Sequence, residues 1–209
     1  SIMTNSGQSC NAPTRMLVPA ARMEEAIAVA GAAASQITVG DPNGNSLLGP
    51  VVSEVQFNKI QKLIQSGIDE GATLVAGGVG RPEGLDKGYY VKPTVFANVT
   101  PEMTISKEEI FGPVLSILGY ENVDQAIQIG NDTEYGLAAY VNGADLSKAR
   151  DVASKLRAGQ VIINGASDLM APFGGDKMSG NGREWGDFAF HEFLETKAVL
   201  GYAPKEAAE

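Results

Sequence analysis

The chain contains a single cysteine, Cys10, which lies in the polar segment 5–11 (NSGQSCN). A cysteine with a structural role usually lies among apolar residues, whereas this thiol has polar neighbours. Gly7 lets the backbone bend close to it, and nearby backbone N–H groups can stabilise a thiolate or an oxyanion. Two interpretations therefore remain open on this segment alone: Cys10 is a nucleophile, or it is a thiol without a chemical role.

Nucleophilic cysteines are often paired with a histidine base, and the chain has one histidine, His191. Its aromatic neighbours Phe190 and Phe193 favour a packed or surface histidine. A protease-like Cys–His site thus has one possible pair and no supporting pattern. One cysteine, one histidine and dispersed carboxylates also show no recognisable ligand spacing, so no metal site is predicted.

Two further segments could contribute to a site. In 107–113 (KEEIFGP), adjacent carboxylates precede a Gly-Pro break and an apolar run. Such carboxylates could bind ribose hydroxyls or act as a base, with a solvated loop as the alternative. The glycine-rich segment 171–184 (APFGGDKMSGNGRE) lacks the spacing of dinucleotide or P-loop fingerprints. It could instead pass close to a pocket with Phe173 as an apolar wall, or form a cluster of structural turns.

Apolar runs alternate with amphipathic segments along the chain, which predicts an α/β fold: a mainly parallel sheet with helices on both faces. The run 114–118 (VLSIL) is typical of a strand that is buried on both faces. Ser53, with Gln56 three residues later, predicts a helix start. The expected strands are 15–19, 73–76, an extended 89–96, 114–118, 137–141, 161–164 and 197–202. The expected helices are 21–36, 53–70, 123–131, 146–156 and 188–194.

Composition limits the class of protein. With 209 residues, 44% apolar and 20% charged, the chain has the make-up of a globular domain. It has no apolar run long enough for a membrane span and no signal-peptide pattern at its start. A net charge of −9 disfavours nucleic acid as a partner. A lone cysteine excludes an intramolecular disulfide, and a reducing cytoplasm is the expected compartment.

The order and spacing of these segments resemble the C-terminal, catalytic part of the aldehyde dehydrogenase superfamily. The resemblance covers nearly the whole chain. Its motifs are NSGQSC at 5–10, LGPVVS at 48–53, EEIFGPV at 108–114, PFGG at 172–175, SG-x-GRE at 179–184 and ETKAV at 195–199.

The resemblance implies that Cys10 attacks an aldehyde and that backbone N–H groups hold the oxyanion. Hydride then passes to NAD or NADP, and water releases a carboxylic acid from the thioester. The cofactor residues that it implies are Glu109 at the nicotinamide ribose, Phe111 near the nicotinamide, and Gln56 and Lys59 close by. The implied substrate residues are Phe173 in the aldehyde pocket, and Ser9 and Asn11 beside the nucleophile.

In this family the upstream half carries the dinucleotide-binding domain, a general-base glutamate and an asparagine oxyanion donor. None of these is matched here, because Cys10 follows only nine residues. We therefore expect a catalytic domain over 1–195, followed at 196–209 by a strand and tail that could pair in a homo-oligomer. The 209-residue chain alone is expected not to oxidise aldehydes with NAD. Neither the aldehyde nor the choice of NAD or NADP follows from the sequence, and the loop 165–171 is short against many relatives.

Two alternatives from other classes remain. One is a non-catalytic interaction or assembly domain derived from the same fold. The other is a thioester-forming acyltransferase or hydrolase that uses Cys10 without a cofactor. The second would need a base within reach of the thiol, and His191 or a carboxylate would have to serve.

Overall fold

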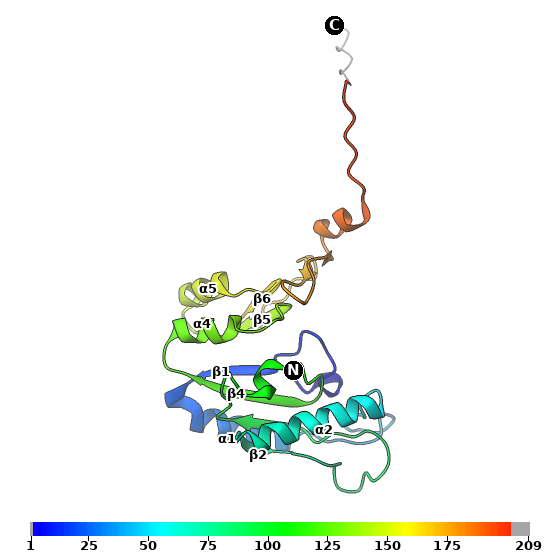
Figure 1. Ribbon diagram of the computed structural model, residues 1–209, viewed down its shortest axis with the longest axis vertical. Coiled ribbons are helices and arrows are strands. Elements are labelled where there is room, and N and C mark those ends of the chain that lie inside the picture. Colours follow the sequence, from blue (N-terminus) through cyan, green and yellow to red (C-terminus); the bar gives the residue numbers. More distant parts are fainter. Residues whose placement is uncertain (1, 202–209) are drawn as a thin grey trace.

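The computed structural model describes residues 2–201 (Figure 1). A four-stranded sheet lies at the centre of its larger unit. Its strand order is β1-β4-β3-β2, and both β1–β4 and β4–β3 are parallel, whereas β2 is antiparallel to β3. The strands are β1 (Arg15–Pro19), β2 (Thr73–Ala76), β3 (Thr94–Ala97) and β4 (Val114–Tyr120). The expected mainly parallel sheet is confirmed.

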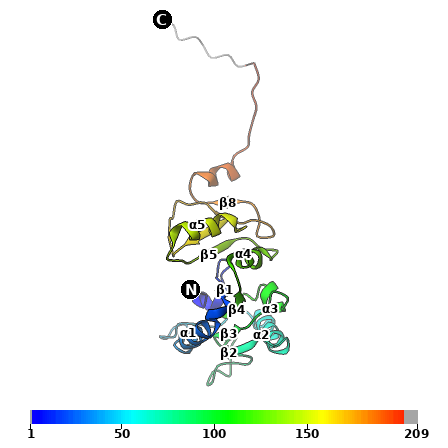
Figure 2. The ribbon, with the colours of Figure 1, turned by 90° about the vertical axis from the view of Figure 1, so that its left-hand side faces the viewer.

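Helices cover both faces of this sheet. Figure 2 shows α1 (Met23–Ser35) and α2 (Glu54–Asp69) on opposite sides of it. Along β4, Leu115 and Ile117 belong to the apolar cluster on the α1 side. Val114 and Leu118 belong to the cluster on the α2 side. This alternation follows from the two-residue period of a strand and confirms that the run is buried on both faces.

Helix α2 begins where the sequence predicts. The Ser53 hydroxyl accepts a hydrogen bond from the Gln56 backbone N–H at 3.2 Å, which caps the helix. One stripe of the helix is buried, with Ile60 and Ile64 completely inaccessible to solvent. Because capping and the apolar stripe act together, the helix holds its first turn, including Gln56, firmly against the sheet.

A smaller unit lies beside the start of β1. It consists of a parallel pair, β5 (Ala138–Val141) and β6 (Gln160–Ile163), with α4 (Val123–Asn131) and α5 (Leu146–Lys155) packed next to it. Arg15 of β1 links the two units, because its guanidinium donates to the carbonyls of Ile129 and Gly130 at 3.1 and 3.0 Å. The bounds of α4 coincide with the predicted helix.

Short elements complete the described chain. They are the 3-10 helices Thr4–Gly7, Ala20–Arg22 and Asp187–Phe193, the one-turn α3 (Thr104–Lys107), and the pair β7 (Phe173–Gly174) and β8 (Arg183–Glu184). The first helix expected from residue 21 starts as a 3-10 turn and becomes α-helical at Met23. The helix expected at 188–194 is likewise a 3-10 helix.

The strand expected at 197–202 does not form over residues 197–201, where the chain runs away from the rest of the molecule (Figure 1). A strand needs a partner for its backbone hydrogen bonds, and none of the described segments lies beside it. Tyr202, the last residue of that prediction, lies outside the described residues. The division into 1–195 and 196–209 stays a prediction. No helix within 2–201 is both long enough and apolar enough to cross a membrane.

Candidate active site

Cys10 lies at the tip of a short turn that leads into β1. The Ala12 N–H donates to the Ser9 carbonyl at 3.0 Å and closes the turn. The Ser9 hydroxyl also donates to the Asn11 side-chain oxygen at 2.7 Å. Cys10 itself is exposed. The thiol is therefore accessible to a reactant, while the backbone that carries it is held in one conformation.

The segment before this turn is strained and anchored. Asn5 and Ser6 have φ angles of 54° and 55°, in the left-handed region that costs non-glycine residues about 1–2 kcal/mol each. The Ser6 hydroxyl donates to the Gly49 carbonyl at 2.9 Å, and the Val52 N–H donates to the Gln8 side-chain oxygen at 2.9 Å. These bonds tie the cysteine segment to the loop that precedes α2 and offset part of the strain.

The second motif, Glu109 to Phe111, is held by α2. The side-chain amide of Gln56 donates to the carbonyls of Ile110 and Phe111 at 3.0 and 2.8 Å. Phe111 has a φ of 54°, so this amide stabilises a turn that a bulky residue rarely adopts. The resemblance assigns Gln56 to the cofactor. Here its amide N–H groups bind the protein backbone, which leaves its side-chain oxygen to accept a bond from a ligand.

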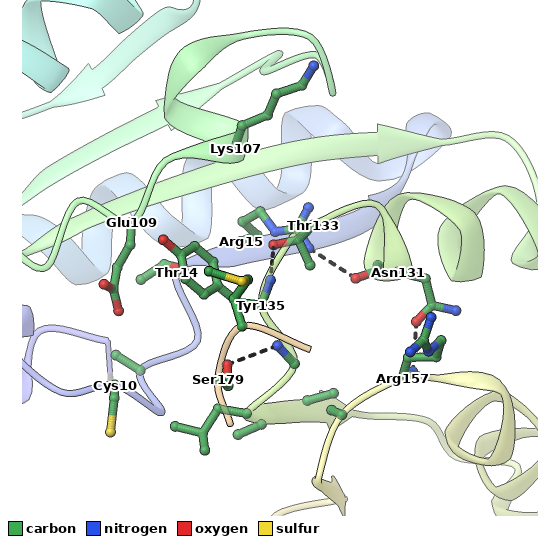
Figure 3. A pocket seen from close by; sticks show the side chains of 18 of the residues that line it. Cys10, Thr14, Arg15, Lys107, Glu109, Asn131, Thr133, Tyr135, Arg157 and Ser179 are labelled. Carbon is green, nitrogen blue, oxygen red and sulfur yellow. Dashed lines mark hydrogen bonds between the residues drawn. The ribbon is translucent and has the colours of Figure 1, made fainter. Parts of the chain in front are cut away.

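A pocket of about 470 Å³ opens between the β1–β4 sheet and the smaller unit. Three of the expected site residues line it: Cys10, Glu109 and Phe173. In Figure 3, Cys10 and Glu109 occupy one side of the view, and Asn131 and Arg157 the other. The structure thus brings together one residue from each of the three motifs that the sequence singled out.

The other expected site residues do not line this pocket. Ser9 and Asn11 flank Cys10 and bind each other. Gln56 binds the Phe111 carbonyl, and Phe111 follows Glu109 by two positions. Lys59 is exposed on α2 and lies outside the pocket.

Two cations, Arg15 and Lys177, bind carbonyls at or just after the end of α4. Arg15 is largely buried, and burial lowers the pKa of its guanidinium, against the opposing charge of Asp132. The Lys177 ammonium donates to the carbonyls of Asn131 and Thr133 at 2.8 and 2.9 Å. Its pKa is lowered, mainly by burial and then by the charge of Arg157. Carbonyls at a helix C-terminus attract cations. Arg15 thus joins the smaller unit to the sheet, whereas Lys177 joins the glycine-rich segment to the end of α4.

Sequence reasoning missed the aromatic support of Phe173. Its ring lies 5.1 Å from that of Trp185, at an interplanar angle of 31°. The two residues are brought together by the β7–β8 pair, in which Phe173 is opposite Glu184. No local pattern predicts this contact. The one tryptophan of the chain, Trp185, directly follows the glycine-rich segment, and this position is the signal that could have indicated it.

The glycine-rich segment lies at the pocket, as one of the two interpretations predicts. The Gly136 N–H donates to the Ser179 hydroxyl at 3.0 Å and joins this segment to the chain entering β5. His191 is exposed in the 3-10 helix Asp187–Phe193 and does not line the pocket. Within 2–201 there is no group of three or more His, Cys, Asp or Glu residues that could hold a metal ion.

With this geometry in view, comparison with known proteins places the chain in a family. The model of the aldehyde dehydrogenase family matches residues 1–199, and the chain belongs to this family. It is 52% identical over 203 residues to a 3-succinoylsemialdehyde-pyridine dehydrogenase from a Pseudomonas species. It is also 50% identical over 205 residues to a putative aldehyde dehydrogenase from Staphylococcus epidermidis. Each match covers 96% of this chain and 43% of the relative.

Solved structures agree. Aldehyde dehydrogenase C from Pseudomonas syringae, in a variant with a cysteine replaced by alanine and in complex with NAD⁺ and octanal, has a TM-score of 0.95 at 52% identity. That match covers 99% of this chain and 43% of the solved one. An NAD⁺ complex of a Mycobacterium tuberculosis aldehyde dehydrogenase has a TM-score of 0.91 at 43% identity, covering 97% and 43%. The chain therefore spans less than half the length of these relatives.

Proposed function

We propose that this chain is the catalytic part of an NAD(P)-dependent aldehyde dehydrogenase and that Cys10 is its nucleophile. One observation carries the proposal: the only cysteine of the chain is exposed at the tip of a fixed turn, in a pocket that it shares with Glu109 and Phe173. A thiol without a chemical role would not need to be exposed in a pocket together with a carboxylate and an aromatic ring. Family membership supports the same assignment.

The proposed reaction begins when the Cys10 thiolate attacks the carbonyl carbon of the aldehyde and forms a tetrahedral thiohemiacetal. The Cys10 backbone N–H makes no hydrogen bond within residues 2–201, so it is available to stabilise the developing oxyanion. Phe173, packed at a tilt against the ring of Trp185, supplies an apolar wall for the aldehyde chain. With a nicotinamide cofactor bound as hydride acceptor, the carbon would lose its hydride to it and remain on Cys10 as a thioester. Attack by water would then release the carboxylic acid and return the Cys10 thiol.

The residues present fit one part of a nicotinamide cofactor. The Glu109 carboxylate is exposed in the pocket and accepts no hydrogen bond within the described chain, so it can accept one from a ribose hydroxyl. Phe111, whose carbonyl accepts from the Gln56 side chain, follows Glu109 by two positions. The cofactor would supply the hydride acceptor, and NAD⁺ occupies related structures. NAD and NADP both remain compatible with these residues.

The scope of this proposal follows from the 43% coverage of the relatives. The general base and a second oxyanion donor are not assigned to this chain, and we expect the 209 residues alone not to oxidise aldehydes. The substrate is proposed only as an aldehyde. A cytoplasmic location and a homo-oligomeric assembly through 196–209 are also part of the proposal. An assembly domain without catalysis and a cofactor-independent acyltransferase are less well supported, because neither accounts for Glu109 in the pocket.

Replacement of Cys10 tests the nucleophile in a full-length polypeptide that contains this chain. We expect Cys10→Ser to lower NADH formation from octanal by a factor of about 10³ or more, because a serine hydroxyl is a far weaker nucleophile. Ser35→Ala, at the exposed end of α1, is the matched control and should keep wild-type turnover. Retained turnover in Cys10→Ser would remove Cys10 from this role. Turnover without NAD or NADP would favour the acyltransferase.

A further inference from the structure

Tyr140 contacts the cysteine turn from the opposite unit of the molecule. Its hydroxyl donates to the Asn11 carbonyl at 2.7 Å, although the two residues are 129 positions apart in the sequence. Tyr140 lies on β5, where it is opposite Ile162 of β6 in a parallel ladder. The hydroxyl is thus presented by a strand that is itself fixed.

The bond from Tyr140 completes the anchoring of one peptide unit. The carbonyl of that unit, on Asn11, accepts from Tyr140, and its N–H, on Ala12, donates to the Ser9 carbonyl. A peptide unit is planar and rigid, so two bonds at its two ends fix its orientation. This orientation restricts the backbone dihedral angles of Asn11, and so it limits the directions in which the preceding residue, Cys10, presents its thiol and its N–H.

The surroundings of Tyr140 also change the pKa of its phenol. The pKa of Tyr140 is raised, first by burial and then by the negative charge that Cys10 carries as a thiolate. The ordinary pKa of a tyrosine, about 10, already keeps the proton on the phenol at neutral pH, and raising it moves ionisation to still higher pH. Tyr140 therefore remains a hydrogen-bond donor to Asn11 at neutral pH.

We propose that Tyr140 is a positioning residue, which orients the nucleophile by holding the Asn11–Ala12 peptide unit. The proposal rests on the proposed role of Cys10. The Tyr140 hydroxyl binds Asn11 and not Cys10, and Tyr140 does not line the pocket. It couples the β5–β6 pair to the cysteine turn, so that a displacement of the smaller unit changes the direction of the thiol.

Steady-state kinetics of a full-length polypeptide that contains this chain give the first test. Tyr140→Phe keeps the ring and removes one neutral hydrogen bond, which corresponds to a factor of about 3–10. We expect kcat for octanal to fall by that factor while the KM values for aldehyde and cofactor stay within twofold. Tyr90→Phe, in the loop before β3, is the matched control and should match the wild type. The proposal would be overturned if kcat were unchanged in Tyr140→Phe. This includes the case in which kcat/KM falls only because KM rises.

Phenol titration of the 209-residue chain gives a second test, which does not depend on dehydrogenase activity. The absorbance difference between wild type and Tyr140→Phe at alkaline pH isolates the ionisation of Tyr140. We expect this ionisation to occur at lower pH in a Cys10→Ser background, because serine carries no charge there. An identical titration in both backgrounds would show that Tyr140 does not face Cys10. If the shift is present but Cys10→Ser keeps full turnover, the proposed function fails while the contact stands.

Discussion

The backbones of Gly7 and Gly112 pack directly against each other. Gly7 has a φ of +72°, and a Cβ built on it would overlap the carbonyl group of Gly112. Gly112 in turn leaves room for the side chain of Ile60, which a Cβ would meet at 2.6 Å. The segment that carries Cys10 and the segment that carries Glu109 therefore share a backbone contact, and neither can move without displacing the other.

Replacing Gly7 tests this contact. Gly7→Ala adds a methyl group where the Gly112 carbonyl lies and also strains a left-handed backbone. We expect the free energy of unfolding to fall by about 2–5 kcal/mol, as the sum of backbone strain and overpacking. Urea unfolding of the 209-residue chain, followed by circular dichroism, measures this change.

Gly84→Ala separates the two causes. Gly84 has a φ of +77° but no neighbouring atom within 4 Å of an added Cβ. Only the strain remains there, so the expected loss is about 1 kcal/mol. Equal losses in both variants would show that Gly112 gives way to the methyl group and that the contact between the two segments is loose.

Gln56 is expected to stabilise the Glu109 segment. Gln56→Met keeps the length of the side chain and removes both donors to the Ile110 and Phe111 carbonyls. The expected loss is about 1–3 kcal/mol, because two half-buried acceptors lose their partners. Gln65→Met is the control on the same helix, where the exposed amide binds only Asp69. If Gln56→Met unfolds like its control, the amide does not hold the strained turn.

Local signals explain which parts of the fold could be predicted from the sequence. Ser53 and Gln56 form a helix cap within four residues. The apolar composition of the run 114–118 is enough to predict that it is buried on both faces. Such features depend on neighbours in the chain. The strand expected from Lys197 was wrong over 197–201 because its partner is not among the described segments.

Contacts between distant residues could not be predicted in this way. The bond from Tyr140 to Asn11 and the stacking of Phe173 on Trp185 depend on which strands pair and in which register. Three ordered motifs predicted that Cys10, Glu109 and Phe173 belong to one site, and the pocket that they line agrees with this. The residues that hold them in place carry no motif, since any side chain of suitable length and chemistry could serve.

Arg15 is expected to fasten the smaller unit to the sheet. Arg15→Met leaves the carbonyls of Ile129 and Gly130 without their donor at the end of α4. Charge-assisted bonds of this kind contribute about 1.5–3 kcal/mol, and we expect a loss of that size in urea unfolding. Arg22→Met, which removes an exposed ion pair to Glu25, should leave the unfolding midpoint unchanged. A similar midpoint for both variants would contradict the role of Arg15.

Asp176 should make stability depend on pH at the acid end. Its carboxylate accepts from the Lys177 N–H at 2.8 Å and faces Arg157 at 3.1 Å. The backbone hydrogen bond first, and then the charge of Arg157, lower the pKa of Asp176 below its ordinary 3.8. The unfolded chain therefore takes up this proton at higher pH than the folded chain does. The stabilisation is complete above the ordinary pKa and is lost as the pH falls through the folded value.

Asp176→Asn removes this proton uptake, so urea midpoints measured from about pH 5 to about pH 2 should fall less steeply in the variant than in the wild type. The variant also loses the charge opposite Arg157, and its midpoint at neutral pH should therefore be slightly lower. Asp86→Asn, an exposed carboxylate in the loop before β3, is the matched control and should keep the wild-type slope. Identical acid slopes in all three proteins would mean that the Asp176 carboxylate binds protons equally well in the folded and unfolded chains, and that its bonds to Lys177 and Arg157 do not persist in solution.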